Sequence, residues 1–428
     1  MKSSIWLLFL AGSAAADINA PDSPPPLRPL PVFGAAPAVP GFEAPPVLSA
    51  SQMLGQAVAG PSHRVREHVA TDGFMAHYSI DSDYGNFDCI GTDQARTRIE
   101  EMEAIRKLTE LSKGDLFAEA LKRSIEQPID AVRNIVKNPV ASVKAVPRTV
   151  GHFFQKVGKS ISNTATNVQE RMENGEAPAA SPKIGQAAKG VIGFDNAKLE
   201  CAKQLGVDPY TDNERLQEEI EKVSWVFFSG GLPLRVGAAV ASGGASVALT
   251  ATKVVGMPDE IYALTPAELA FRNQQEMSAM GVAEPVARAF NANEALSITL
   301  RRSILRSLAA IGDVNGRVAI VEVAARCENR RQAEFLDRAL ALLAARKQSG
   351  KSSIVSLEAV GRLPGAIDSS GQLLIPAPVD YLSWTPEVAE FAGRDDLAGR
   401  KPMLLLAGSA SERTRAELAA RGWTITTP

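Results

Sequence analysis

The chain has 428 residues, of which 45% are hydrophobic, 22% charged and 6% aromatic. Its formal net charge is −2, and this near balance argues against a dedicated nucleic-acid-binding protein. The length is sufficient for two or three domains, and the many alanines and glycines favour helices that pack closely through small side chains.

The first sixteen residues have the three parts of a secretory signal. Lys2 supplies a positive charge, residues 5–11 are apolar, and Ala14 and Ala16 are the small residues before a cleavage site. The apolar run is far shorter than the ~20 residues that a spanning helix needs. A buried N-terminal helix is the alternative, but a proline-rich tract follows at once. We therefore predict a signal peptide over residues 1–16, cleaved near Ala16, and a periplasmic or extracellular mature protein.

The pattern beyond the signal predicts an α+β fold that is mainly helical. It comprises an N-terminal β-hairpin, a central helical body and a small C-terminal α/β unit. The predicted divisions are a disordered Pro/Ala-rich linker over residues 17–60, a β-hairpin with a basic helical region over 61–173, a helical domain over 186–347 and an α/β domain over 351–428.

Periodicity and capping signals give the individual elements. Residues 74–80 alternate in polarity and a turn over 83–86 follows, which predicts a hairpin. A three-residue apolar repeat predicts a helix up to Leu111, capped by Thr92 or Asp93. Thr211 and Glu214 have the spacing of a capping box, which predicts the start of another helix. Residues 403–425 read as strand, helix and strand, which is a β-α-β unit.

The stretch from residue 131 to residue 169 contains six basic residues and no acidic residue. Apolar side chains beside them follow helical spacing, which is typical of a helix lying on an anionic membrane surface. In the alternative interpretation, the apolar face packs on the protein core and the basic residues are solvated. The candidate contact residues for a membrane or a partner protein are Arg148, Phe153, Phe154, Lys156 and Lys159.

Residues 224–257 are rich in glycine and alanine, and they carry no charge from Val236 to Thr252. Seventeen uncharged residues are at the lower limit for a membrane span. A close-packed helix or loop is the other interpretation, and an exported factor anchored by this stretch is a third hypothesis for the function.

The loop at 406–413 links a predicted strand to a predicted helix, and the N–H groups of that helix start could bind an anion. The candidate residues are Ser409, Ser411 and Arg413. The loop and helix resemble the final unit of sulfurtransferase (rhodanese-like) domains over about twenty residues. That resemblance implies a cysteine nucleophile at the strand end, where this chain has Ala407. A simple helix cap is the alternative.

Cysteines and histidines give no metal or cofactor motif, and we predict neither a metal nor a cofactor. The three cysteines, Cys89, Cys201 and Cys327, are far apart, so one disulfide or three free thiols are both possible for an exported chain. The four histidines, His63, His68, His77 and His152, have no metal-ligand spacing.

Three segments resemble uncharacterised exported proteins of proteobacteria: 83–87 (DYGNF), 205–211 (LGVDPYT) and 378–385 (PVDYLSWT). The resemblance spans most of the mature chain and implies export, but no activity and no site. The function we expect is that of a non-enzymatic cell-envelope protein that binds an anionic membrane surface or an envelope protein, without nucleic acid. The alternative is an exported hydrolase or transferase with its site at the C-terminal β-α-β loop. The oligomeric state is left open.

Overall fold

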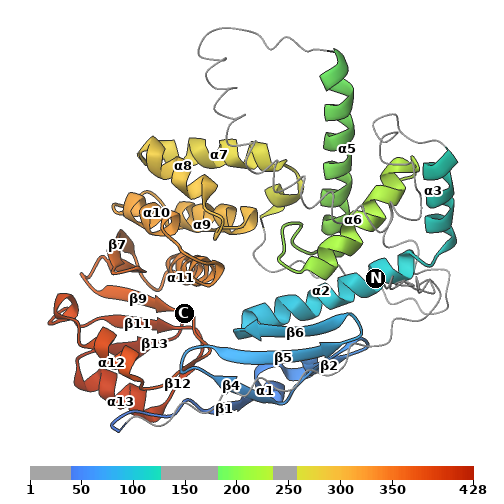
Figure 1. The fold of residues 1–428 in the computed structure, drawn as a ribbon. Helices are drawn as coiled ribbons and strands as arrows, with labels where there is room; N and C mark the ends of the chain where they lie inside the picture. Colours follow the sequence, from blue (N-terminus) through green and yellow to red (C-terminus); the bar gives the residue numbers. More distant parts are fainter. Residues whose placement is uncertain (1–39, 127–181, 235–257) are drawn as a thin grey trace, which may run out of the picture.

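A computed structural model describes residues 40–126, 182–234 and 258–428 (Figure 1). In these residues the chain is α+β and mainly helical, as the sequence predicts. The predicted signal peptide, residues 17–39 of the linker, the whole basic stretch over residues 131–169 and most of the glycine-rich stretch lie outside the described residues.

The N-terminal unit is a sheet in which β1 pairs with β4, and β5 pairs with β3, β4 and β6. Its elements are β1 (Val47–Ser49), α1 (Ala50–Leu54), a 3-10 turn (Gly55–Val58), β2 (Ala59–Gly60), β3 (His63–Val65), β4 (His68–Thr71), β5 (Ala76–Ser82) and β6 (Gly85–Ile90). The predicted hairpin is confirmed: Tyr78 pairs with Cys89, and Ser82 pairs with Gly85.

The linker prediction was wrong at its C-terminal end. The prolines stop at Pro46, and from Val47 onward the backbone pairs with β4 in antiparallel register. Ser49 then caps α1, and Leu54 is buried in the sheet core. Residues 47–60 are therefore part of the folded body, because the chain regains backbone donors and apolar side chains directly after the last proline.

Helix α2 (Thr92–Leu111) follows and lies along the sheet, beneath α6 in Figure 1. The predicted range is confirmed, but neither Thr92 nor Asp93 caps it. Its N-cap residue is Gly91, which has φ of +97° and no side chain. The missing cap is supplied by a carboxylate from a distant part of the chain, described below.

The helical body consists of α3 (Asp115–Glu126), α5 (Pro182–Leu205), α6 (Glu214–Ser229), a 3-10 turn (Asp259–Tyr262), α7 (Pro266–Ala279), α8 (Glu284–Ala292), α9 (Ile298–Ile311), α10 (Arg317–Ala325) and α11 (Arg330–Gln348). One apolar core joins α2, α3, α5 and α6, and another joins α7 to α11 with the C-terminal sheet. The capping-box prediction for α6 was wrong. Asn213 caps this helix, because Thr211 points away to contact Glu101 on α2.

The C-terminal unit is a five-stranded sheet in the order β13-β11-β9-β8-β7. Its strands are β7 (Ile354–Val360), β8 (Leu363–Asp368), β9 (Leu373–Ala377), β11 (Met403–Leu406) and β13 (Thr424–Thr426), with α12 (Pro386–Ala392), a 3-10 turn (Asp395–Leu397) and α13 (Glu412–Ala420). Strands β11 and β13 are parallel and α13 connects them, so the β-α-β prediction is confirmed. The short strands β10 (Tyr381–Leu382) and β12 (Ser409–Ala410) also pair in parallel.

Asp380 joins the C-terminal unit to the N-terminal sheet. Its carboxylate accepts a hydrogen bond from the N–H of Ala76 at 2.9 Å and, with both oxygens, from the N–H of Thr92 at 3.1 and 3.2 Å. A carboxylate at a helix N-terminus satisfies free N–H donors and complements the helix dipole. Asp380 is thus the cap of α2, although 288 residues separate it from Thr92.

We expect Asp380→Asn to lower the free energy of unfolding by about 1–3 kcal/mol, because the variant loses the charge that holds two backbone donors. Urea denaturation of the mature chain measures the effect. Asp395→Asn is the matched control, since Asp395 is exposed on the same unit, and its expected change is within about 0.5 kcal/mol. Equal losses in the two variants would contradict the capping role.

Candidate functional site

The basic residues predicted to contact a membrane or a partner, Arg148, Phe153, Phe154, Lys156 and Lys159, lie outside the described residues. The helices that flank them are described, and both pack on α6. Phe117 of α3 lies 6.2 Å from Phe227 between ring centroids. Phe194 of α5 lies edge-on to Trp225 at 5.3 Å. The two described helices on either side of the basic stretch therefore contact the same helix.

Of the glycine-rich stretch, residues 224–234 are described and 235–257 are not. Ser224 and Phe227 are buried in α6, and Gly230 packs against α3. A Cβ at Gly230 would lie 2.3 Å from the carbonyl oxygen of Ala120, so this glycine permits a close helix contact. Among the described helices, none is both long and apolar enough to cross a membrane.

The three residues of the predicted anion site lie in or just before the first turn of α13, and each makes different contacts. Ser411 is the N-cap residue, and its Oγ accepts a hydrogen bond from the N–H of Thr414 at 2.9 Å. Ser411 is only 8% exposed. Ser409 is exposed and belongs to β12. Arg413 donates a hydrogen bond to the carbonyl oxygen of Gly41, in the first described segment of the chain.

The first described segment of the chain also places the Glu43 carboxylate beside the start of α13. The Ser411 hydroxyl donates to Oε2 of Glu43 at 2.5 Å. The N–H of Trp384 donates to the same oxygen at 2.6 Å. The predicted anion site comprised Ser409, Ser411 and Arg413 with the N–H groups of the helix start. In the structure only Ser411 of these three side chains donates to the Glu43 carboxylate, and the Trp384 N–H was not predicted. The Ser411 hydroxyl therefore serves as a cap and a carboxylate donor, not as a free nucleophile.

The three cysteines and the histidines His63 and His77 have separate contacts in the described part of the chain. Cys89, Cys201 and Cys327 are all free thiols, and burial raises the pKa of Cys89 and of Cys201 to about 12. His63 contacts the Ala57 carbonyl oxygen, and His77 contacts Asp72. Within the described parts of the chain, no group of three His, Cys, Asp or Glu side chains could hold a metal ion.

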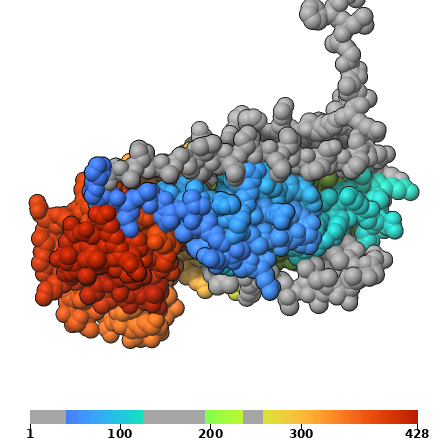
Figure 2. All heavy atoms as spheres, turned by 90° about the horizontal axis from the view of Figure 1, so that it is seen from below, coloured from blue at the N-terminus to red at the C-terminus, as the bar shows by residue number. Residues whose placement is uncertain are grey.

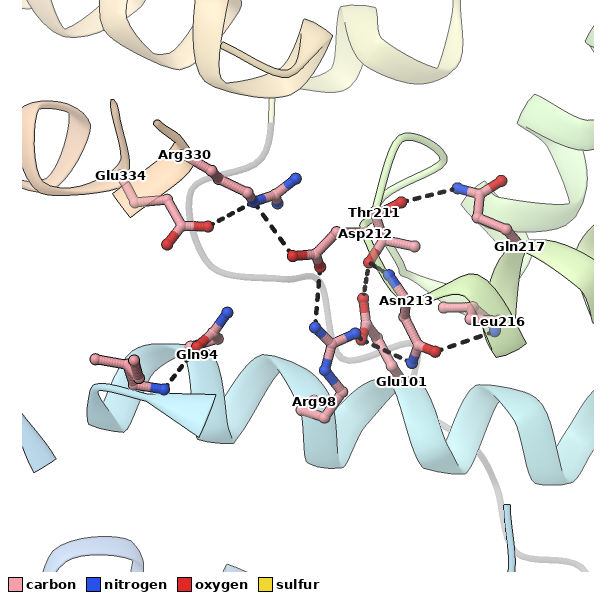
Figure 3. Close-up of polar contacts among 11 residues, drawn as sticks. Gln94, Arg98, Glu101, Thr211, Asp212, Asn213, Leu216, Gln217, Arg330 and Glu334 are labelled. Carbon is pink, nitrogen blue, oxygen red and sulfur yellow. Dashed lines mark hydrogen bonds and ion pairs between the residues drawn. The ribbon is translucent and has the colours of Figure 1, made fainter. Parts of the chain in front are cut away.

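A cluster of charged residues lies at the junction of α2, the loop before α6 and α11 (Figure 3). Arg98 and Glu101, one turn apart on α2, form an ion pair of 2.6 Å between Nη1 and Oε2. Thr211 and Asn213 donate their side-chain hydrogen bonds to the two oxygens of Glu101, that of Asn213 at 3.0 Å. Burial raises the pKa of Glu101, although the Arg98 guanidinium opposes this shift.

Asp212 extends the cluster to a third element. Its Oδ1 accepts from Arg98 Nη2 at 2.9 Å, and its Oδ2 lies 3.3 Å from Nε of Arg330 at the start of α11. Arg330 is held in turn by Glu334 at 2.7 Å. The positive and negative charges alternate and pair with each other, so the cluster joins α2, the loop before α6 and α11. We interpret it as a structural junction.

Sequence analysis missed Glu43, Asp380 and the Arg98–Glu101 pair. Glu43 lies in the predicted linker and Asp380 in a segment for which no helix or strand was predicted, and their partners are more than 280 residues away along the chain. Arg98 and Glu101 carried one signal: both fall on the apolar side of α2, near Met102 and Ile105. A charged pair on a buried helix face indicates a polar contact with another element.

Comparison with known proteins gives no match: no family model, no curated protein and no solved structure is similar to this chain.

The cluster can be tested with two arginines on the same helix. Arg98→Ala leaves Glu101 buried without its cation, and we expect it to lower the free energy of unfolding by about 3–5 kcal/mol. Arg106→Ala removes an arginine that pairs with Glu103 and Glu110 nearer the surface, and we expect a loss of at most about 1 kcal/mol. Similar losses in chemical denaturation would show that the buried pair has no special role.

Proposed function

We propose that this protein is an exported, non-enzymatic component of the cell envelope, and that residues 131–169 bind an anionic membrane surface or an acidic envelope partner. The observation that carries the proposal is the charge of this stretch, which has six basic residues and no acidic one. Its apolar residues at helical spacing give it the second face that surface binding uses. Each basic residue near an anionic lipid surface contributes about 1 kcal/mol.

Helices α3 and α5 flank residues 127–181 in the chain, and both contact α6 through aromatic rings. The signal peptide over residues 1–16 and the resemblance to exported proteobacterial proteins support the location.

The export part predicts that mature protein begins near Asp17 and is recovered from the periplasm or the medium. Mass spectrometry of the N-terminal peptide after cell fractionation measures this. A chain with Ala14→Arg and Ala16→Arg has lost the small residues that processing requires, and we expect it to keep its full N-terminus. Full-length wild-type protein found in the cytosol would overturn this part.

The binding part is tested by flotation of the mature chain with vesicles, at low and high salt. We expect binding to vesicles that contain phosphatidylglycerol, little binding to pure phosphatidylcholine, and loss at high salt. The triple variant Phe153→Ala, Lys156→Gln and Lys159→Gln removes two charges, worth about 2 kcal/mol, so vesicle binding should fall by more than tenfold.

A matched control removes the same residue types from the described body. Lys113, Lys203 and Phe271 are all exposed, and Phe271 is 59% exposed. The variant Lys113→Gln, Lys203→Gln and Phe271→Ala should therefore bind vesicles like the wild type. Equal loss in both triple variants, or binding that ignores lipid charge, would contradict a role of residues 131–169 at the membrane.

A further inference from the structure

The segment Gly41-Phe42-Glu43 lies on the C-terminal unit in the way that a bound peptide lies on a receptor. The N–H of Glu43 donates to the Trp384 carbonyl oxygen at 2.9 Å, and the N–H of Trp384 donates back to the Glu43 carboxylate at 2.6 Å. Figure 2 shows these first described residues, in the darkest blue, against the red C-terminal unit.

The carboxylate position is built by three groups of the C-terminal unit. The Trp384 N–H and the Ser411 hydroxyl donate to Oε2 of Glu43, and the Thr414 hydroxyl lies 3.4 Å from the same atom. Ser411 and Trp384 are 8% and 2% exposed, so these donors face the carboxylate with little water around them. Hydrogen bonds to a charged acceptor are stronger than those between neutral groups.

The residue before the carboxylate and the surrounding charge complete the recognition. Phe42 is partly buried against the apolar core that contains Leu382 and Trp384. Arg413 donates to the Gly41 carbonyl oxygen, and the guanidinium of Arg421 lies 4.7 Å from the Trp384 ring centroid. Both arginines also pair with Glu417. The surface therefore offers an apolar contact for Phe42, a carboxylate position for Glu43 and a guanidinium donor for the Gly41 carbonyl oxygen.

The C-terminal unit supplies every residue on the receptor side, from Leu382 to Arg421. The occupant comes from the other end of the chain: 341 positions separate Glu43 from Trp384. On the occupant side, residues 44–46 connect Glu43 to strand β1, which begins at Val47. We propose that the C-terminal unit is a binding site for extended peptides that carry an aromatic residue followed by a carboxylate, and that residues 41–43 occupy it in cis.

An occupant that belongs to the same chain has a high effective concentration, on the order of millimolar for a short flexible connection. A free peptide competes only above that level, so the wild-type chain shields its own site. Replacing Phe42 and Glu43 with alanine removes the apolar contact and the carboxylate without touching the receptor residues. Only backbone hydrogen bonds of Gly41 and Glu43 then hold the segment, so the site is open to competition. This inference is independent of the basic stretch.

The test uses the mature chain and a fluorescent peptide with the sequence of residues 39–46, VPGFEAPP. The open variant Phe42→Ala with Glu43→Ala should bind this peptide at least tenfold more tightly than the wild-type chain does. Adding Ser411→Ala to the open variant should weaken binding at least tenfold, and so should a peptide in which glutamine replaces glutamate. Adding Ser409→Ala, an exposed neighbouring serine, should leave the affinity unchanged.

Equal peptide affinity in the open variant with and without Ser411→Ala overturns the proposal, and so does indifference to the glutamate. A measurement on the unaltered chain covers the case in which the variants fail to fold. In hydrogen exchange, an excess of free peptide should speed exchange of the Glu43 amide while the Trp384 amide region stays protected. An unchanged exchange rate at Glu43 in a large excess of peptide also overturns the proposal.

Discussion

The Asp380 carboxylate lies where the N-terminal sheet, helix α2 and the C-terminal unit meet, and the backbone there has two N–H groups that need an acceptor. The glycines around it leave room for this contact. A Cβ at Gly91 would lie 2.6 Å from Met75, and one at Gly408 would lie 2.1 Å from the Asp380 carbonyl oxygen. The Asp380 carboxylate caps the first turn of α2, and Arg98 and Glu101 lie farther along the same helix, where they contact the loop before α6. One helix therefore carries both the contact to the C-terminal unit and the charged junction to α11.

The parts of the fold that local sequence specifies were predicted well. The alternation over residues 74–80 gave the hairpin, the three-residue repeat gave α2, and the β11–α13–β13 unit followed from short apolar runs around a helical segment. These signals lie within a few residues of each other and report on the core face of one element. The helical body was predicted in the same way, although α5 begins at Pro182, before the start of the predicted helical domain at residue 186.

The contacts between units were not predicted, because their partners are remote. Thr211 has the spacing of a capping residue, yet its hydroxyl donates a hydrogen bond to Glu101, and Asn213 caps α6 instead. Glu43 follows a proline-rich tract that composition marks as unstructured, but a carboxylate position on the C-terminal unit orders it. In each case a polar side chain satisfies a donor on another element, and no local pattern encodes such a pairing.

The span of these contacts has a consequence for how the protein is made. Glu43 and the first turn of α2 meet their partners only after residues 380–414 have been synthesised, and chain closure over such distances is slow. Until then Glu43 and the N-terminus of α2 lack their hydrogen-bond partners, Ser411 and Asp380. Under the proposed export route, a chain whose long-range contacts form last stays unfolded for longer. Slow formation of these contacts is therefore compatible with translocation of an unfolded chain.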